Sequence, residues 1–208
     1  MQLVEQHGVK GLALSDAARL AGVSVAAPYR HFTDKEALLA EIAAEGFRLF
    51  RDALATASQS HPKDKVKRLV EMGVAYVEFA LQHRSHFKVM WEGGISKEKY
   101  PEVGRMAYEA YLLLEKAAKD LLPASPPGRQ QTLVATAWSL VHGYASLTLE
   151  QELDVIRAEQ SDKKRLQQSL HLTFAMVLVV SVALLLLAML VPAVVIRRAH
   201  EVTTPVAH

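Results

Sequence analysis

The side chains best suited to recognition chemistry fall between Ser15 and Leu39, on either side of a sharp turn. Gly22 is expected to end one helix, because glycine adopts the left-handed backbone conformation without strain. Ser24 is a strong amino-terminal cap for a second helix that ends near Phe32 and carries Val25, Ala26, Ala27, Tyr29, Arg30 and His31. Two helices joined at a glycine are the layout of a helix-turn-helix, whose second helix enters the major groove of DNA. The pattern predicts a DNA-reading module.

The elements around this turn must hold the second helix in place. Small residues let the first helix lie close to another element: Ala17, Ala18 and Ala21. Val23 is expected to fill the corner of the turn. Thr33 or Asp34 is expected to cap a third helix, with Glu36 in its first turn.

The run AGVSVAAPYRHFTDKEALL resembles the helix-turn-helix signature of TetR-type repressors, in the order AGVS, Tyr-x-His-Phe and Lys-Glu-Ala-Leu-Leu. Much further along, Trp138, His142 and Gly143 are similar to the Trp-x-x-x-His-Gly motif of one TetR subgroup. The two motifs lie in the order expected for the family and span about residues 3–150. The resemblance implies a helix-turn-helix domain followed by a helical domain that binds an effector and dimerises.

The resemblance also implies roles for the residues of the module. The residues matched to phosphate-contacting positions are Ser24, Tyr29, His31 and Lys35, and those facing base edges are Val25, Ala26 and Ala27. Small apolar side chains can touch thymine methyl groups but cannot make bidentate hydrogen bonds to bases, and Arg30 is the one long donor nearby. The expected partner is double-stranded DNA with a pseudo-palindromic operator, because a homodimer has two-fold symmetry.

Two residues depart from the family pattern. Pro28 stands where the family often has Leu or Ile. At the fourth helical position it removes only the first backbone bond, so we expect the helix to survive. Ala13 replaces the usual Thr or Ser cap of the preceding helix, at a cost of about 1 kcal/mol.

The start of the chain is short for this family. Only Met1–His7 precede Gly8, fewer than two helical turns, which fits either a start codon placed too far downstream or a natural short form. The charges of the first forty residues cancel. The four basic residues are Lys10, Arg19, Arg30 and Lys35, and the four acidic residues are Glu5, Asp16, Asp34 and Glu36. A DNA-binding head usually has a basic face, so this balance argues against strong nonspecific affinity.

From Lys35 to Glu150 the apolar residues recur at helical spacing, and no run alternates with a period of two. The expected helices are 35–58, 62–83, 85–91, 101–122 and 129–150, with Val66 and Leu147 among the inward-facing residues. The expected domains are 1–45 (helix-turn-helix), 46–170 (effector binding and dimerisation), 172–196 (an apolar transmembrane helix) and 197–208 (a tail). The predicted fold class is all-α.

Several large side chains fall on the helices that enclose the ligand cavity in the family. The candidate pocket residues are Phe79, Phe87, Met90, Trp91, Tyr108, Tyr111, Trp138 and His142. Aromatic walls with few polar groups suit a small-molecule site, although the same residues could simply fill a core. Trp138 and His142 share a helix face, and His142 could bond a ligand or a buried carbonyl.

The residue types argue against an enzyme. The chain has no cysteine, no Gly-rich phosphate loop, no Gly-x-Ser-x-Gly and no His-Glu-x-x-His. His83 and His86 have ligand-like spacing, but two histidines without a carboxylate partner are a weak metal signal. We therefore expect no catalytic residue, no metal site and no cofactor.

An uncharged stretch lies near the carboxyl end. Phe174–Ile196 has 23 residues without a charge and is flanked by Lys163–Arg165 and Arg197–Arg198. As a helix it would be about 34 Å long, enough to cross a hydrocarbon core of about 30 Å. Three interpretations stay open: a membrane anchor, an unusually apolar dimerisation helix, or a fusion or reading-frame artefact.

The sequence thus predicts a homodimeric transcriptional regulator, chiefly a repressor released from its operator by a small molecule. Its DNA-binding part would be cytoplasmic and tethered to the inner membrane by the apolar helix. The alternative is a membrane-bound helical sensor or adaptor whose shortened head does not bind DNA.

Overall fold

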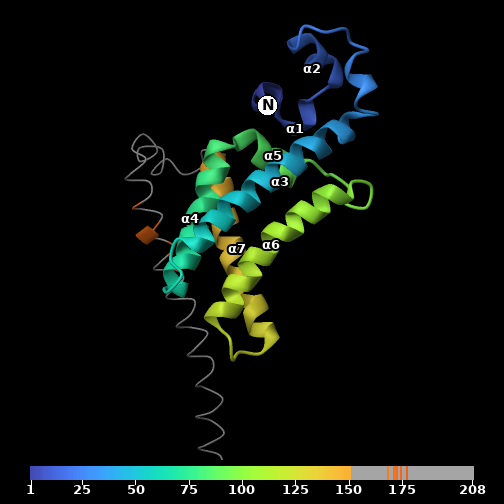
Figure 1. Cartoon of the computed structure of the whole chain (residues 1–208). Coiled ribbons are helices and arrows are strands. Elements are labelled where there is room, and N and C mark those ends of the chain that lie inside the picture. The colour runs from blue at the N-terminus through green and yellow to red at the C-terminus, as the bar shows by residue number, and fades with distance from the viewer. Residues whose placement is uncertain (151–167, 169–170, 173, 175–176, 178–208) are drawn as a thin grey trace, which may run out of the picture.

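The computed structural model describes residues 1–150 and, beyond them, residues 168, 171, 172, 174 and 177. Within these residues the chain forms seven α-helices, one 3₁₀ turn and no β-strand (Figure 1). The elements are α1 (Gln2–Gly11), α2 (Leu14–Leu20), η1 (Pro28–Arg30), α3 (Lys35–Gln59), α4 (Lys65–Gln82), α5 (Arg84–Glu92), α6 (Pro101–Leu121) and α7 (Pro127–Leu149). The all-α prediction is confirmed for this part of the chain.

The short elements α1, α2 and η1 gather at one end of the molecule, shown in blue in Figure 1, and we call them the head. α3 begins beside the head and runs along α6, α4 and α5, while α7 packs on α4 and α6. One cluster of buried apolar residues extends from Val4 in α1 to Leu149 in α7. The head and the longer helices therefore share a core.

α3 connects the two parts because it has a firm start and a continuous apolar face. The Asp34 carboxylate accepts a hydrogen bond from the Ala37 backbone N–H at 2.8 Å, which confirms the predicted cap. The buried face is spaced by threes and fours: Leu39, Ala43, Phe47, Phe50 and Leu54. With 25 residues, the helix is about 37 Å long.

α3 and α5 approach closely at Gly46, near the middle of α3. A Cβ atom placed on Gly46 would lie 2.7 Å from Met90 Sδ and 3.2 Å from His86 Cβ. Any side chain at this position would displace Met90, so the close contact between the two helices favours glycine.

Some of the expected helix boundaries and inward-facing residues are wrong. Pro62 does not open α4: the Asp64 carboxylate caps it by accepting from the Lys67 N–H at 2.9 Å, so the helix begins at Lys65. Val66 is 38% exposed because it lies in the first turn, before the apolar stripe meets the core, and Leu147 in α7 is 45% exposed. α7 begins earlier than expected, at Pro127.

Two residues of the predicted membrane span, Phe174 and Val177, are among those described. Phe174 is 3% exposed, and its ring lies 5.7 Å from the ring of Tyr144 in α7. It also lies beside Gly73 of α4. Phe174 is thus part of the helical core and Val177 lines the cavity described below, and the other residues of the predicted span lie outside the described residues. Among the residues that the structure describes, no helix is long and apolar enough to cross a membrane.

Candidate DNA-reading head and effector cavity

The turn after α2 has the geometry that the sequence predicts. The Gly22 N–H donates to the Arg19 carbonyl at 3.2 Å, and the Val23 N–H donates to the Ala18 carbonyl at 3.0 Å. Gly22 has a φ of +68°, which favours glycine. These two bonds form a Schellman motif, so Gly22 ends α2 sharply.

The predicted second α-helix is absent from the head, and our expectation that it survives Pro28 is wrong. Residues 24–27 form turns, with the Ala27 N–H donating to the Ser24 carbonyl at 2.9 Å, and Pro28–Arg30 form the 3₁₀ turn η1. Proline has no N–H for the α-helical bond to the Ser24 carbonyl, so tighter i to i+3 bonds replace it. Ser24 consequently caps no α-helix.

The residues assigned to DNA contact nevertheless lie at the surface. Val25 is 57% exposed and Tyr29 56% exposed. Also exposed are Ser24, Ala26, Arg30 and His31, whereas Ala27 is half-buried. Val23, expected to fill the corner, is 49% exposed, because no second α-helix packs across α2 to cover it.

Lys35 is half-buried and already has a partner within the head. Its ammonium donates to the backbone carbonyl of Lys10 at 2.7 Å. The bond joins the end of α1 to the start of α3 and leaves the charge without a carboxylate partner among the described residues. Ala13, as expected, gives α2 no side-chain cap.

A cluster of charges, which we call the clasp, ties the loop between α5 and α6 to the start of α3. Lys99 Nζ lies 2.7 Å from Glu36 Oε2 and 3.2 Å from Asp34 Oδ2, and the Ser96 N–H donates to Glu36 Oε1 at 3.1 Å. The bond from Lys99 holds the pKa of Glu36 below its usual range, and these carboxylates raise the pKa of Lys99. The clasp neutralises two of the acidic groups that offset the basic residues of the head.

A second contact docks α1 on α5. Ser85 is 4% exposed, and its hydroxyl donates to Glu5 Oε1 at 3.0 Å and lies 3.3 Å from the Met1 carbonyl. A buried hydroxyl is stable only when it has such partners. The position of the head is therefore set from α5 as well as from α3.

A cavity of about 420 Å³ lies between α3, α4, α6 and α7, within the range of small-molecule sites. Its walls are mostly apolar. The lining residues are Phe47, Phe50, Leu54, Leu69, Val70, Met72, Gly73, Tyr76, Trp91, Lys97, Gly104, Ala107, Tyr108, Ala110, Tyr111, Leu114, Leu133, Thr136, Ala137, Trp138, Leu140, Val141, Phe174 and Val177.

The structure divides the eight candidate pocket residues into two groups. Four line the cavity: Trp91, Tyr108, Tyr111 and Trp138. The other four are not part of the lining: Phe79, Phe87, Met90 and His142. Sequence reasoning missed Phe47, Phe50 and Tyr76, whose spacing is that of any core stripe, and Lys97, which resembles any surface lysine.

His142 supports the cavity wall from behind. The hydroxyl of Tyr76, a lining residue, lies 2.8 Å from His142 Nδ1. The imidazole also packs 4.9 Å from the ring of Trp91 and 5.6 Å from that of Phe87, measured between centroids. Burial lowers the pKa of His142 and raises the pKa of Tyr76, so both groups favour the neutral form.

His83 and His86 lie near each other beside α3, with ring centroids 5.8 Å apart. His86 Nε2 is 3.6 Å from Glu45 Oε2. Burial, followed by the neighbouring His86, lowers the pKa of His83. Within the described part of the chain, no group of three His, Asp or Glu residues could hold a metal ion.

Residues 1–42 match the model of the bacterial regulatory proteins of the tetR family, and residues 69–170 match that of the tetracyclin repressor-like C-terminal domain. A solved structure of a protein with unknown function from Rhodococcus sp. RHA1 is 29% identical, with 84% of this chain and 89% of that chain covered and a TM-score of 0.65. A tetR-family regulatory protein from Rhodococcus RHA1 is 18% identical (72% and 90% covered, TM-score 0.57). The TetR family transcriptional regulator PfmR from Thermus thermophilus is also 18% identical (72% and 93% covered, TM-score 0.55). No curated protein matches the chain.

Proposed function

Because this chain carries both the N-terminal and the C-terminal domains of the TetR family, we propose that it is an effector-responsive transcriptional regulator that acts chiefly as a repressor. It binds double-stranded DNA as a homodimer, with one head in each half of a pseudo-palindromic operator. A small molecule in the cavity favours the conformation in which the heads are misplaced, and so releases the DNA.

The continuity of α3 is the observation that carries this proposal. Its first residue follows the cap at Asp34, directly after the exposed reading segment 24–32, and its later turns supply Phe47, Phe50 and Leu54 to the cavity wall. The boundary proposed between residues 45 and 46 falls inside this helix. A change in the cavity therefore acts on an element that begins beside the head.

Within the head we retain the roles that the resemblance implies. Phosphates are contacted by Ser24, Tyr29, His31 and Lys35, and base edges by Val25, Ala26 and Ala27, with Arg30 as the long donor. Exposure supports these roles for every one of these residues except Ala27 and Lys35, which are half-buried. The Trp-x-x-x-His-Gly subgroup is also retained as a proposal, since Trp138 lines the cavity and His142 supports it through Tyr76.

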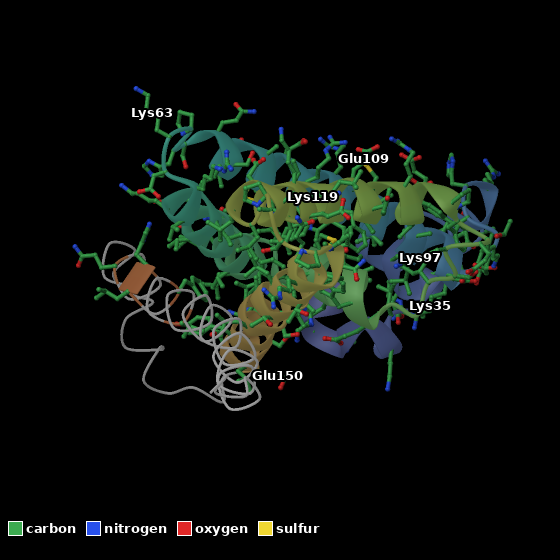
Figure 2. The ribbon with its side chains drawn as sticks, turned by 90° about the horizontal axis from the view of Figure 1, so that it is seen from below. Lys35, Lys63, Lys97, Glu109, Lys119 and Glu150 are labelled. Carbon is green, nitrogen blue, oxygen red and sulfur yellow. The ribbon has the colours of Figure 1, made fainter. Side chains whose placement is uncertain are left out.

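Selection of bound sequences from random DNA with the full chain tests the function. We expect enrichment of a pseudo-palindrome. Lys35→Ala should weaken binding to all sequences alike and reduce the salt slope by about one, as for a phosphate contact. Lys63→Ala, in the turn before α4 and far from the head, is the matched control (Figure 2). A change of sequence preference in Lys35→Ala with an unaltered salt slope contradicts the assigned role.

The alternative, a membrane-bound sensor whose head does not bind DNA, draws on the missing second α-helix and on the uncharged segment 174–196. Failure to enrich any sequence would favour it. The membrane anchor itself is a separate proposal, supported by the 23 uncharged residues. The burial of Phe174 requires any span to begin after this residue.

A further inference from the structure

The cavity wall carries a single formal charge among the described residues. Lys97 is charged, and the remaining lining residues are apolar, aromatic, hydroxyl-bearing or glycine. No carboxylate lines the cavity in this part of the chain. An apolar ligand site with one cation discriminates strongly by charge, because an amine brought beside Lys97 would be repelled and an anion attracted.

Lys97 lies at the solvent edge of the cavity with its stem across α6. The Cβ of Lys97 would be 3.4 Å from a Cβ placed on Gly104, so a bare backbone accommodates the lysine stem. One turn further along α6, the exposed ring of Tyr108 stacks on Tyr111 at 6.2 Å between centroids. The stem of Lys97 therefore lies on α6 one turn before this tyrosine pair, and the side chain is exposed to solvent while it lines the cavity.

The side chain of Lys97 has a charged neighbour in Glu98, whose pKa it helps to lower, but no ion pair with it. Lys97 makes no ion pair or hydrogen bond with its side chain anywhere in the described residues. Its neighbour Glu98 accepts a hydrogen bond from the Ser96 hydroxyl at 2.9 Å, and Lys99 belongs to the clasp. Of the two lysines on this loop, Lys97 is the one left to bind an external anion.

We infer that the cavity takes an amphiphilic anion, a carboxylic acid with an aliphatic or aromatic body, whose carboxylate pairs with Lys97. The body lies against the apolar walls, where its burial provides most of the affinity. The carboxylate stays at the mouth, so only one end of the ligand needs a charged partner. This inference rests on the proposed function, since it names the class of effector.

The position of Lys97 also couples the ligand to the head. Lys97 and Lys99 lie two residues apart on the loop between α5 and α6, and Lys99 holds Glu36 and Asp34 at the start of α3. A carboxylate that draws Lys97 toward the cavity moves the same loop that the clasp attaches to the head.

Titration of the full chain with decanoate and decylammonium below their micelle concentrations, and with decanol below its solubility limit, tests the inference. The chain has two tryptophans, Trp91 and Trp138, and both line the cavity, so their fluorescence reports occupancy. We expect decanoate to bind about two- to fivefold more tightly than decanol, as for an exposed ion pair, and decylammonium to bind most weakly. Lys97→Met should remove the difference between decanoate and decanol, and Lys97→Glu should reverse the order of the two ions.

Lys63→Met is the matched control and should keep the wild-type order, because Lys63 does not line the cavity and lies at the opposite end of the molecule from Lys97 in Figure 2. Thermal melting of each variant establishes that it is folded. Equal affinity for decanoate and decanol, binding of none of the probes, or an unchanged order in folded Lys97→Met overturns the inference. A further outcome separates the two proposals. If decanoate binds in a Lys97-dependent way but does not release operator DNA, the ligand class is supported and the proposed function is contradicted.

Discussion

The imidazole of His142 shows how one residue can matter to the cavity without touching a ligand. It bonds to the hydroxyl of Tyr76 and packs between aromatic rings, and burial lowers its pKa, which favours the neutral form. Its importance therefore lies in holding the wall in shape. Substitutions at this position should therefore affect the stability of the fold and its dependence on pH more than the choice of ligand.

The lowered pKa of His142 gives the stability of the protein a pH dependence of defined sign. Below the ordinary histidine pKa of about 6.5, the unfolded chain binds a proton that the folded chain resists. The free energy of unfolding should therefore fall as the pH drops from about 7 through that value toward the lowered folded pKa. Urea unfolding of His142→Asn should show a smaller loss over this interval. His7→Asn, on the exposed side of α1, is the control, and an equal loss in both variants would exclude the role of His142.

At the scale of elements, Pro28 decides the form of the reading segment. Pro28→Leu restores the missing N–H and should convert residues 24–32 into an α-helix, since the helical bond to the Ser24 carbonyl can then form. We expect higher ellipticity at 222 nm and tighter binding to the selected operator. Pro62→Leu, in the turn before α4, should change neither. If Pro28→Leu leaves both signals unaltered, the proline is not the cause of the 3₁₀ turn.

The clasp also acts between elements, because it ties the loop between α5 and α6 to the start of α3, and it is exposed to solvent. Lys99→Met should lower the melting temperature at low salt, with a difference that disappears near 1 M salt, where the Debye length is about 3 Å. It should also weaken operator binding, because the loop no longer holds the start of α3. Lys119→Met removes a pair with Glu115 inside α6 alone and should leave operator binding intact. If Lys99→Met and Lys119→Met change operator binding equally, the clasp stabilises the fold but does not position the head for DNA.

The parts of the fold that were predictable from sequence are those set by local chemistry. Gly22, Asp34 and the stripe on α3 each act through neighbours three to five residues away, so spacing alone identifies them. The turns that replace the second helix do not follow from one backbone bond lost at Pro28, because the whole short segment depends on that bond. Lys97 and Tyr76 gain their roles from helices distant in sequence, which no local pattern reports.

At the scale of the whole molecule, Phe174 tests whether the carboxyl segment belongs to the helical core or begins a membrane span. Phe174→Ala should lower the free energy of unfolding by about 3 to 5 kcal/mol, as for a buried aromatic residue. Urea denaturation of the full chain, purified without detergent or extracted with it, measures this change. Leu172→Ala, at a 66% exposed position nearby, is the control. Unchanged stability in Phe174→Ala would return this residue to the predicted span.

The close contact of Gly46 with Met90 gives α3 the mechanics of a lever. α3 is held near its middle, with Lys35 about 16 Å from the fulcrum on one side and Leu54 about 12 Å from it on the other, at 1.5 Å per residue. If the rod turns rigidly, a ligand that pushes Leu54 outward by about 1 Å swings the Lys35 end by about 1.4 Å in the opposite direction. In a two-fold dimer the axis repeats the displacement in the second subunit, so the distance between the two heads changes by up to twice that amount. Oxidation of Met90 to the sulfoxide would place a polar oxygen at this fulcrum.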